Sequence, residues 1–196
     1  GVDPESHLAP VVLEAGDLAA YRATHALSHV FPLLYDVLGR AAVDCDCVMA
    51  VGDAEGQLLW VTGPAGVMRK AETINFVEGS MWSEQDAGTN APGMALRLGQ
   101  PVHVHASEHF NRLVHPWSCA AAPITDPTTS RVLGVVDITG GPDVASPQSL
   151  AMIRAAARMA ESELARLALT GTTLAAPGPT PQPGASTGVL RVRGLG

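Results

Sequence analysis

Apolar residues between Asp17 and Ala41 recur at alternating spacings of three and four, which is the spacing of one face of a helix. Pro32 falls inside this stripe, and a proline removes a helical hydrogen bond and disfavours helix at the residue before it. The pattern therefore predicts a long N-terminal helix that is kinked, or divided into two helices, near Phe31. The stripe consists of Ala20, Ala23, Leu27, Val30, Leu34, Val37 and Ala41.

An alternation with period two follows and predicts a β-hairpin. Residues 43–52 alternate, residues 53–56 (Asp-Ala-Glu-Gly) form a turn, and residues 57–62 return as a second strand. One side of the first strand would carry Val43, Cys45, Cys47, Met49 and Val51. Pro64 then opens a short helix that runs to Ala71.

The stretch from Phe76 to Leu98 reads as a structured loop that leads into a helix. Before Gly88 it has no steady apolar period, whereas Thr89 or Asn90 can cap a helix and Pro92 suits its first turn. Met94, Ala95 and Leu98 would form the apolar face of this helix. The free N–H groups at such a helix start suit an anionic ligand, but most helix starts use them internally.

Three further strands and a final helix complete the pattern. The strands are expected at residues 101–106, 117–124 and 131–139, with a loop and a helical turn at 107–114. The order of helix, two strands, helices, three strands and helix predicts an α+β domain. In such a domain an antiparallel sheet carries helices on one face and a pocket on the other.

The final helix, from Ser146 to Leu169, carries apolar residues at heptad spacing. A seam this narrow more often meets another helix than a sheet, so we expect a helical dimer interface. Packing of this helix on the N-terminal helix of its own chain is an equally good alternative. The seam consists of Leu150, Ile153, Ala157, Ala160, Leu164 and Leu167.

Composition indicates one globular domain with tails, because 196 residues, of which 46% are hydrophobic, can bury one good core. Residues 1–16 are irregular and are expected to be an exposed extension, and residues 17–170 form the domain. Residues 171–188 are rich in Pro and Gly and predict a linker. Residues 189–196 alternate again, like the first strand of a further module.

The net charge of −7 and only 12 basic residues argue against a nucleic-acid-binding surface on this fragment. Any DNA contact is expected in a module outside it. There is no apolar run long enough to span a bilayer and no leader pattern, which predicts a soluble, cytoplasmic protein without membrane contact. Three cysteines are an odd number and fit a reducing compartment better than a disulfide framework.

Five motifs in this order carry a resemblance to a known family. They are Gly79-Ser-Met-Trp82-Ser-Glu84, Gly88-Thr-Asn-Ala-Pro-Gly93, Glu108-His-Phe110, Ser118-Cys-Ala-Ala-Ala-Pro-Ile124 and Leu133-Gly-Val-Val-Asp-Ile-Thr-Gly140. Residues 17–169 resemble a GAF domain. More narrowly, they resemble the sensory GAF domain of transcriptional regulators of the acetoin-catabolism activator type.

The resemblance implies a GAF-like antiparallel sheet of five to six strands, flanked by long N- and C-terminal helices through which two copies form a homodimer. It also implies a small-molecule pocket between the sheet and the loop region, and a linked DNA-binding module. It implies no catalysis and does not specify the effector or any cofactor. Pro92 departs from the aliphatic residue that many relatives carry, and no cysteine has the context of bilin attachment.

Seven residues are the predicted ligand contacts. Trp82 is the best candidate for a pocket wall, with Trp117 next, and the pair Glu108 and His109 could either contact a ligand or anchor its loop. The predicted ligand-binding residues are Trp82, Glu84, Thr89, Asn90, Glu108, His109 and Cys119. No catalytic or metal-binding residue is predicted.

Three alternatives remain open at this point. His103, His105 and His109 could hold a metal or haem, although two solvated histidines on an outer strand face explain the first two as well. Cys119 could serve a thiol-dependent enzyme of the free methionine sulfoxide reductase type, but a buried small hydrophobe fits better. The domain could also be a purely structural dimerisation unit. Asp137, inside an apolar strand, is expected to brace a neighbouring loop.

Overall fold

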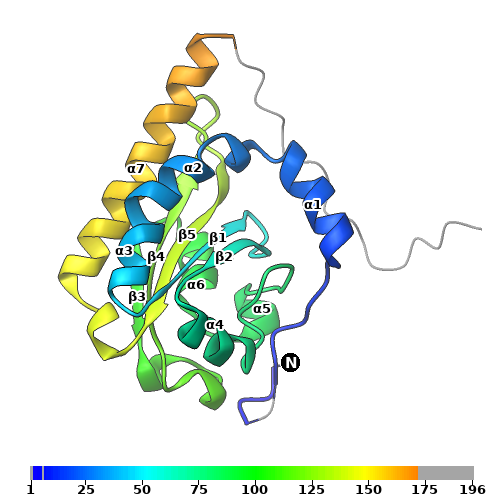
Figure 1. Cartoon of the computed structure of the whole chain (residues 1–196), viewed down its shortest axis with the longest axis vertical. Helices are drawn as coiled ribbons and strands as arrows, with labels where there is room; N and C mark the ends of the chain where they lie inside the picture. Colours follow the sequence, from blue (N-terminus) through cyan, green and yellow to red (C-terminus); the bar gives the residue numbers. More distant parts are fainter. Residues whose placement is uncertain (1, 6, 172–196) are drawn as a thin grey trace, which may run out of the picture.

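The computed structural model describes residues 2–5 and 7–171, and an antiparallel sheet lies at its centre (Figure 1). The five strands are hydrogen-bonded in the order β2-β1-β5-β4-β3. Their bounds are β1 Val48–Asp53, β2 Leu58–Thr62, β3 Val102–His105, β4 Ser118–Thr125 and β5 Val132–Gly140. The predicted GAF-like α+β fold, with flanking helices, is therefore confirmed.

Helices cover both faces of the sheet. One face carries α2 (Phe31–Leu34), α3 (Arg40–Asp44) and α7 (Pro147–Leu169), and the other carries the loops with α4, α5 and α6 (Figure 1). The bounds of these shorter helices are Ala65–Glu72, Glu84–Ala87 and Ala91–Leu98, while α1 spans Ala15–Thr24. Short 3-10 turns lie at Ala26–His29, Ala106–Glu108, Arg112–Val114 and Pro142–Val144. Within the described ranges, every helix is too short or too polar to cross a bilayer.

The heptad seam of α7 is buried inside its own chain. Ile153, Ala157, Ala160 and Leu164 lie in one apolar cluster with sheet residues such as Val136 and with α2 and α3. These side chains are therefore not free to meet a second copy, and the prediction that the seam is a dimer interface is wrong. The alternative of packing on the N-terminal helix of the same chain holds, with the sheet as a second partner.

The predicted division of the N-terminal helix is confirmed, and Pro32 lies in the first turn of α2. The break begins earlier, because α1 ends at Thr24 and a 3-10 turn intervenes. This break lets α1 present another face to the core: Leu18 and Tyr21 are buried, while Ala20 and Ala23 are exposed. The predicted apolar stripe is therefore wrong in α1, because its members Ala20 and Ala23 do not face the core.

A π-helical turn at Tyr35–Gly39 explains a second departure. A π turn adds one residue to the helical repeat, so the buried positions move from Val37 and Ala41 to Leu38 and Ala42.

The helix then continues to Asp44, and β1 begins only at Val48. Cys45 lies in the exposed turn between them, whereas Cys47 is buried. The prediction that these two cysteines share a strand is wrong, because the local alternation spans the end of a helix and a turn.

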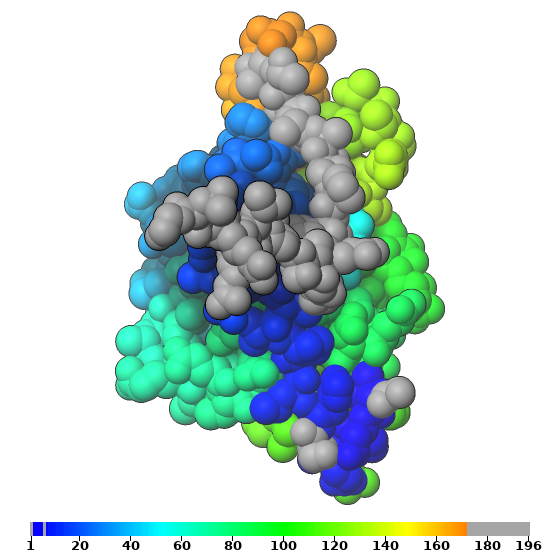
Figure 2. Space-filling model, turned by 90° about the vertical axis from the view of Figure 1, so that its right-hand side faces the viewer, coloured from blue at the N-terminus to red at the C-terminus, as the bar shows by residue number. Residues whose placement is uncertain are grey.

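Residues 7–14 lie across the loop layer, and we call them the N-terminal strap. Figure 2 shows the dark blue N-terminal part of the chain between the turquoise and green segments. The Leu13 N–H donates to the Gly79 carbonyl at 3.3 Å, and the Met81 N–H donates to Pro10 at 2.8 Å. Gly79 has a φ of +83°, and a Cβ there would lie 2.3 Å from the Leu13 carbonyl oxygen. This glycine therefore permits the close contact, and the strap is not an exposed extension.

Candidate functional site

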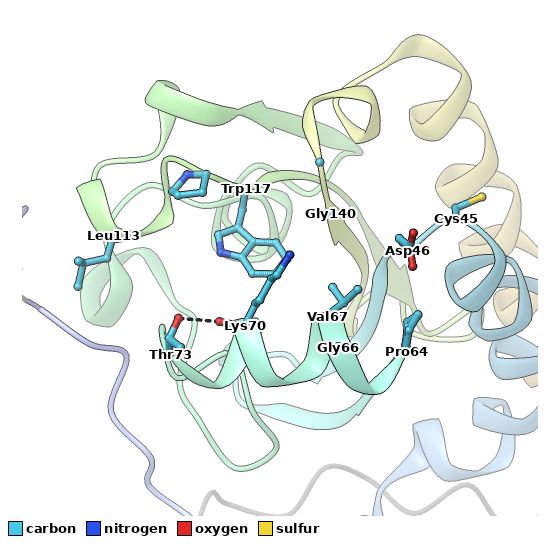
Figure 3. Close-up of a pocket in the computed structure, with 12 residues that line it drawn as sticks. Cys45, Asp46, Pro64, Gly66, Val67, Lys70, Thr73, Leu113, Trp117 and Gly140 are labelled. Atoms are coloured by element: carbon cyan, nitrogen blue, oxygen red, sulfur yellow. Dashed lines mark hydrogen bonds between the residues drawn. The ribbon is translucent and has the colours of Figure 1, made fainter.

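A cleft of about 770 Å³ opens on the loop side of the sheet (Figure 3). Its walls come from α4, the loop before β4, the α3–β1 turn and the end of β5. Ligand sites for small molecules commonly measure 300–1,000 Å³, so this cleft has a suitable size. It is lined by Cys45, Asp46, Pro64, Gly66, Val67, Lys70, Thr73, Leu113, Pro116, Trp117, Gly140 and Gly141.

One face of α4 forms a long wall of the cleft. The helix starts directly after Pro64, whose backbone is extended, and its Ala71 is buried against the body of the domain. Val67, Lys70 and Thr73 follow one another at spacings of three, which places their side chains on one helical face. This spacing turns an apolar, a cationic and a hydroxyl side chain towards the same space.

Trp117 separates the cleft from the sheet. The indole is 8% exposed and belongs to an apolar cluster with Val48, Ala50 and Phe76. Its backbone N–H donates to the Val114 carbonyl at 2.9 Å, which closes the turn that carries the loop into β4. The cleft therefore has a rigid aromatic wall whose other side lies in the core.

A buried polar cluster lies beneath the loop layer on the same side of the sheet. The Thr139 hydroxyl donates to Asp137 Oδ2 at 2.7 Å and lies 3.1 Å from Cys119 Sγ. His109 Nε2 lies 3.4 Å from the same sulfur, and His109 Nδ1 donates to the Ala106 carbonyl at 2.9 Å. We call Asp137, Thr139, Cys119 and His109 the polar cluster.

Small neighbours surround the carboxyl group of this cluster. Asp137 lies in the central strand, opposite Ala50 of β1 and Ala121 of β4. It is 1% exposed, and its Oδ1 has no hydrogen-bond partner in the described part of the chain. Native proteins pair nearly all buried polar atoms, so an unpaired carboxyl oxygen here calls for an explanation.

Burial controls the protonation of the cluster. It raises the pKa of Asp137 to about 8, although the Thr139 hydrogen bond acts in the opposite direction. It also raises the pKa of the Cys119 thiol well above its usual range and lowers the pKa of His109. The thiol is thus kept protonated, which is the reverse of an activated cysteine nucleophile.

The cleft and the polar cluster are neighbours. Gly140 lines the cleft and directly follows Thr139 in β5, and Trp117 precedes Cys119 by two residues. Ser118 and Gly140 are paired across β4 and β5, beside the pair of Cys119 and Thr139. The cleft therefore ends close to the polar cluster along β4 and β5, although the four residues of the cluster are not part of its lining.

A second hollow of about 380 Å³ lies on the helix side of the sheet. Leu38 and Ala42 line it together with Val144 and Met152. Cys45 and Gly141 line both this hollow and the cleft. The α3–β1 turn and the end of β5 thus form a wall between the two spaces.

The structure brings two of the seven predicted ligand residues together, His109 and Cys119. Trp82 lies elsewhere: it is buried against Phe76, and its Nε1 donates to the Asn75 carbonyl and the Ser80 hydroxyl, each at 3.2 Å. Glu84 forms an ion pair with Arg97 at a separate hollow lined by α5 and α6.

The other three predicted residues have partners within the chain. Asn90 Oδ1 accepts from the Gly93 N–H at 2.8 Å and caps α6, so this helix start uses a side chain of its own. The Thr89 carbonyl accepts from the Phe110 N–H at 3.3 Å. Glu108 Oε2 accepts from the His105 N–H at 2.7 Å and is exposed, which fits its role as a loop anchor.

His103 and His105 lie on the edge strand β3 with both side chains exposed, while Val104 between them is buried. His109 is buried and faces Cys119 instead. In residues 2–5 and 7–171, no three His, Cys, Asp or Glu side chains are grouped to hold a metal ion. The histidines thus have the positions that the solvated alternative expected.

Sequence reasoning missed most of the cleft, although Trp117 was named as a second wall candidate. A signal was present in α4, where Val67, Lys70 and Thr73 repeat at spacings of three. The other wall, at Cys45 and Asp46, was hidden because that segment was expected to be a strand.

Comparison with known proteins gives the family. Residues 17–162 match the family model described as the N-terminal domain of MimR. An uncharacterised 47.3 kDa protein in the thcA 5′ region of Rhodococcus erythropolis is 49% identical over 84% of this chain and 38% of its own length. The acetoin dehydrogenase operon transcriptional activator AcoR of Bacillus subtilis is 36% identical over 84% of this chain and 27% of its length.

The structure of the Escherichia coli DhaR(N)–DhaL complex contains a similar fold. It aligns with a TM-score of 0.76 and 21% identity, over 86% of this chain and 57% of that chain. The two curated relatives above are much longer than this chain, which spans 38% and 27% of their length.

Proposed function

Because the chain belongs to the family described as the MimR N-terminal domain, we propose that it is a small-molecule-sensing regulatory domain of a cytoplasmic transcriptional regulator. The resemblance to regulators of the acetoin-catabolism activator type is confirmed, and the relative AcoR is a transcriptional activator. DNA contact then belongs to another part of a longer protein, as the net charge of −7 also favours.

The cleft beside Trp117 is the observation that carries this proposal. It has the volume of a metabolite site and an aromatic wall, and the polar cluster, with Asp137 Oδ1 unpaired in the described part of the chain, lies nearby in the sheet. An effector in the cleft would lie against Trp117. The proposal is regulation rather than catalysis, because the relative AcoR is a transcriptional activator; the raised pKa of the buried Cys119 thiol also disfavours a thiolate nucleophile.

A route from the cleft to the next module runs through the helices. The α3–β1 turn lines the cleft, and Leu38 and Ala42, just before this turn, pack in the same cluster as Ile153 of α7. Effector binding would shift an existing equilibrium in this packing, and α7 would carry the change towards the C-terminal end of the chain.

In this proposal the homodimer uses the outward face of α7, because four residues of the seam, Ile153, Ala157, Ala160 and Leu164, are buried. Met152 and Met159 are seven residues apart on that face and are 39% and 44% exposed. Apart from Gly171, the predicted linker at 171–188 lies outside the described residues, as does the start of a further module at 189–196, and both stay predictions.

A ligand panel with a blocked cleft tests the proposal. Thermal unfolding of the chain would be measured with short hydroxyketones, aromatic acids, cyclic nucleotides and haem. A ligand at a hundred times its dissociation constant adds about 2.7 kcal/mol and raises the midpoint by roughly 5–10 °C. Val67→Phe, which fills the cleft, should abolish the rise.

Val43→Phe is the matched control, since Val43 is 47% exposed on α3 and does not line the cleft. Thr73→Trp is a second cleft variant at an exposed position, for use if Val67→Phe unfolds. A rise that survives both cleft variants would place the effector elsewhere. The absence of any rise would favour the structural dimerisation unit or a protein partner of the kind seen in the DhaR(N)–DhaL complex. Turnover of an oxidised small substrate that Cys119→Ser abolishes would instead favour the thiol enzyme.

A further inference from the structure

Lys70 is the single lysine in the sequence, and it lies in the cleft. The protein has 19 acidic and 12 basic residues, so its overall field repels anions. A positive charge in a ligand-sized cleft of such a protein can attract an anion locally, against the overall repulsion. Lys70 is exposed on α4 and lines the same cleft as Trp117 (Figure 3).

Among the described residues, the ammonium group of Lys70 has no ion-pair partner. In residues 2–5 and 7–171, six arginines have a carboxylate within 4.0 Å, and Lys70 has none. The neighbouring Arg69 does not line the cleft. Among the residues that line this space, the ammonium group of Lys70 is therefore a cation that a bound molecule can pair with.

The other charged side chain of the cleft is Asp46, which lies beyond Val67 from Lys70 in Figure 3. Its backbone has a φ of +51°, in the tight turn that joins α3 to β1. Apolar surface from Val67, Leu113 and Trp117 lies along the same cleft. The cleft thus offers a cation, an apolar stretch and an anion.

We propose that the cleft binds a small organic carboxylate, with its carboxylate paired to the Lys70 ammonium and its apolar or aromatic body against Val67 and Trp117. Asp46 accepts a hydrogen bond from a hydroxyl or ammonium group at the other end of the molecule. The inference rests on the proposed function and names the chemical class of its effector.

A carboxylate fits this site better than a phosphate. One ammonium group balances one carboxylate charge, whereas a phosphate carries nearly two charges and three acceptor oxygens. Phosphate sites usually add arginine or several backbone N–H donors. Arg69, the nearest arginine in sequence, lies outside the lining of the cleft.

Matched acid and amide probes test the proposal by calorimetry. The acids are propionate, benzoate, 3-phenylpropionate and indole-3-acetate, each compared with its neutral amide. For the acid that binds best, we expect about tenfold tighter binding than for its amide, since tenfold corresponds to about 1.4 kcal/mol, the size of one charge-assisted hydrogen bond.

Three variants assign this preference to one side chain. Lys70→Gln should bring the ratio of the two affinities close to one, and Lys70→Arg should keep most of it. Arg69→Gln removes the adjacent cation outside the cleft and should leave the ratio unchanged. Equal loss in Arg69→Gln and Lys70→Gln would show attraction to general surface charge and would overturn the proposal.

The single lysine also permits a direct footprint. An amine-reactive reagent can acylate Lys70 and the amino terminus, so the terminus serves as an internal reference. Mass spectrometry should show that a bound acid slows acylation of Lys70 several-fold, whereas its amide does not.

The outcomes separate the two proposals. If no acid protects Lys70, while a neutral metabolite stabilises the protein and Val67→Phe abolishes that effect, the carboxylate inference fails and the sensor proposal stands. If neither acids nor the metabolite panel bind, both fail. If acids bind equally well to Lys70→Gln, Lys70 is a solvated surface residue and the inference is overturned.

Discussion

The two faces of the central sheet are built from alternate residues of the same strands, yet they differ in kind. Towards α7, β1 and β5 present large side chains, such as Met49 and Ile138, to an aliphatic cluster. Towards the loops, the same strands present Ala50 and Asp137. The first face provides stability, while the second carries smaller side chains and a carboxyl group, one oxygen of which, Asp137 Oδ1, has no partner among the described residues.

The difference shows how one sheet serves two tasks. Burial of large aliphatic side chains stabilises a protein by about 1.5–3 kcal/mol for each side chain. A buried polar atom without a partner costs about 1–3 kcal/mol. The helix face therefore offsets a cost that the loop face incurs at Asp137, where the neighbouring cleft can admit a ligand.

The largest expected effect is on the helix face. Ile153→Ala removes a fully buried side chain of α7 and should lower the free energy of unfolding by about 2–5 kcal/mol. Met159→Ala, at a 44% exposed position of the same helix, is the control and should cost less than about 1 kcal/mol. Urea denaturation measures both. Similar losses in the two variants would contradict the assignment of the inward face.

The next effect is on the loop face and depends on pH. Burial raises the pKa of Asp137 to about 8 in the folded protein, so its carboxyl group ionises less readily there than in the unfolded chain. Stability from this group is therefore complete below pH 4 and is lost as pH rises towards 8. Asp137→Asn should be more stable than the native protein at pH 8, by roughly 2 kcal/mol, and should show little gain at pH 5.

Three other buried groups with shifted pKa values are present in both proteins. Burial raises the pKa of Asp53 to about 6, lowers the pKa of His25 to about 4 and also lowers the pKa of His109. The comparison therefore uses the difference between native and variant at each pH, measured by urea denaturation. A difference that does not change between pH 5 and pH 8 would mean that Asp137 has a partner in solution.

The smallest effect separates a structural role from a binding role on the loop face. Asn90→Ala removes the cap of α6 and should cost about 1 kcal/mol of stability. Effector affinity, measured by calorimetry, should stay unchanged, because Asn90 does not line the cleft. Asn90→Ser keeps an oxygen acceptor and serves as the control. If Asn90→Ala clearly lowers effector affinity while Asn90→Ser does not, Asn90 would again be a candidate ligand contact.

Local signals account for what the sequence could predict. Pro32 and Asn90 act on the backbone next to them, so the divided N-terminal helix and the start of α6 could be read directly. The five strands followed from alternation and turns, and the motifs from Gly79 to Gly140 identified the family. These features can be predicted without knowing which surfaces of the folded chain pack against each other.

The remaining features depend on contacts between distant segments. The α7 seam looked like a dimer interface because its spacing does not reveal whether the partner is another chain or the sheet. The π turn shifts the buried positions to Leu38 and Ala42 without any sequence mark that spacing could detect. His109 and Cys119 could be named as candidates, but their meeting with Asp137 through Thr139 requires the register of β4 and β5.

The wall formed by Cys45 and Gly141 belongs to both faces of the sheet. Because both residues line the cleft and the helix-side hollow, a change in their position alters the lining of both spaces. A substitution at Cys45 therefore changes the lining of the cleft and of the helix-side hollow at once, and its effects on the two spaces have to be measured together.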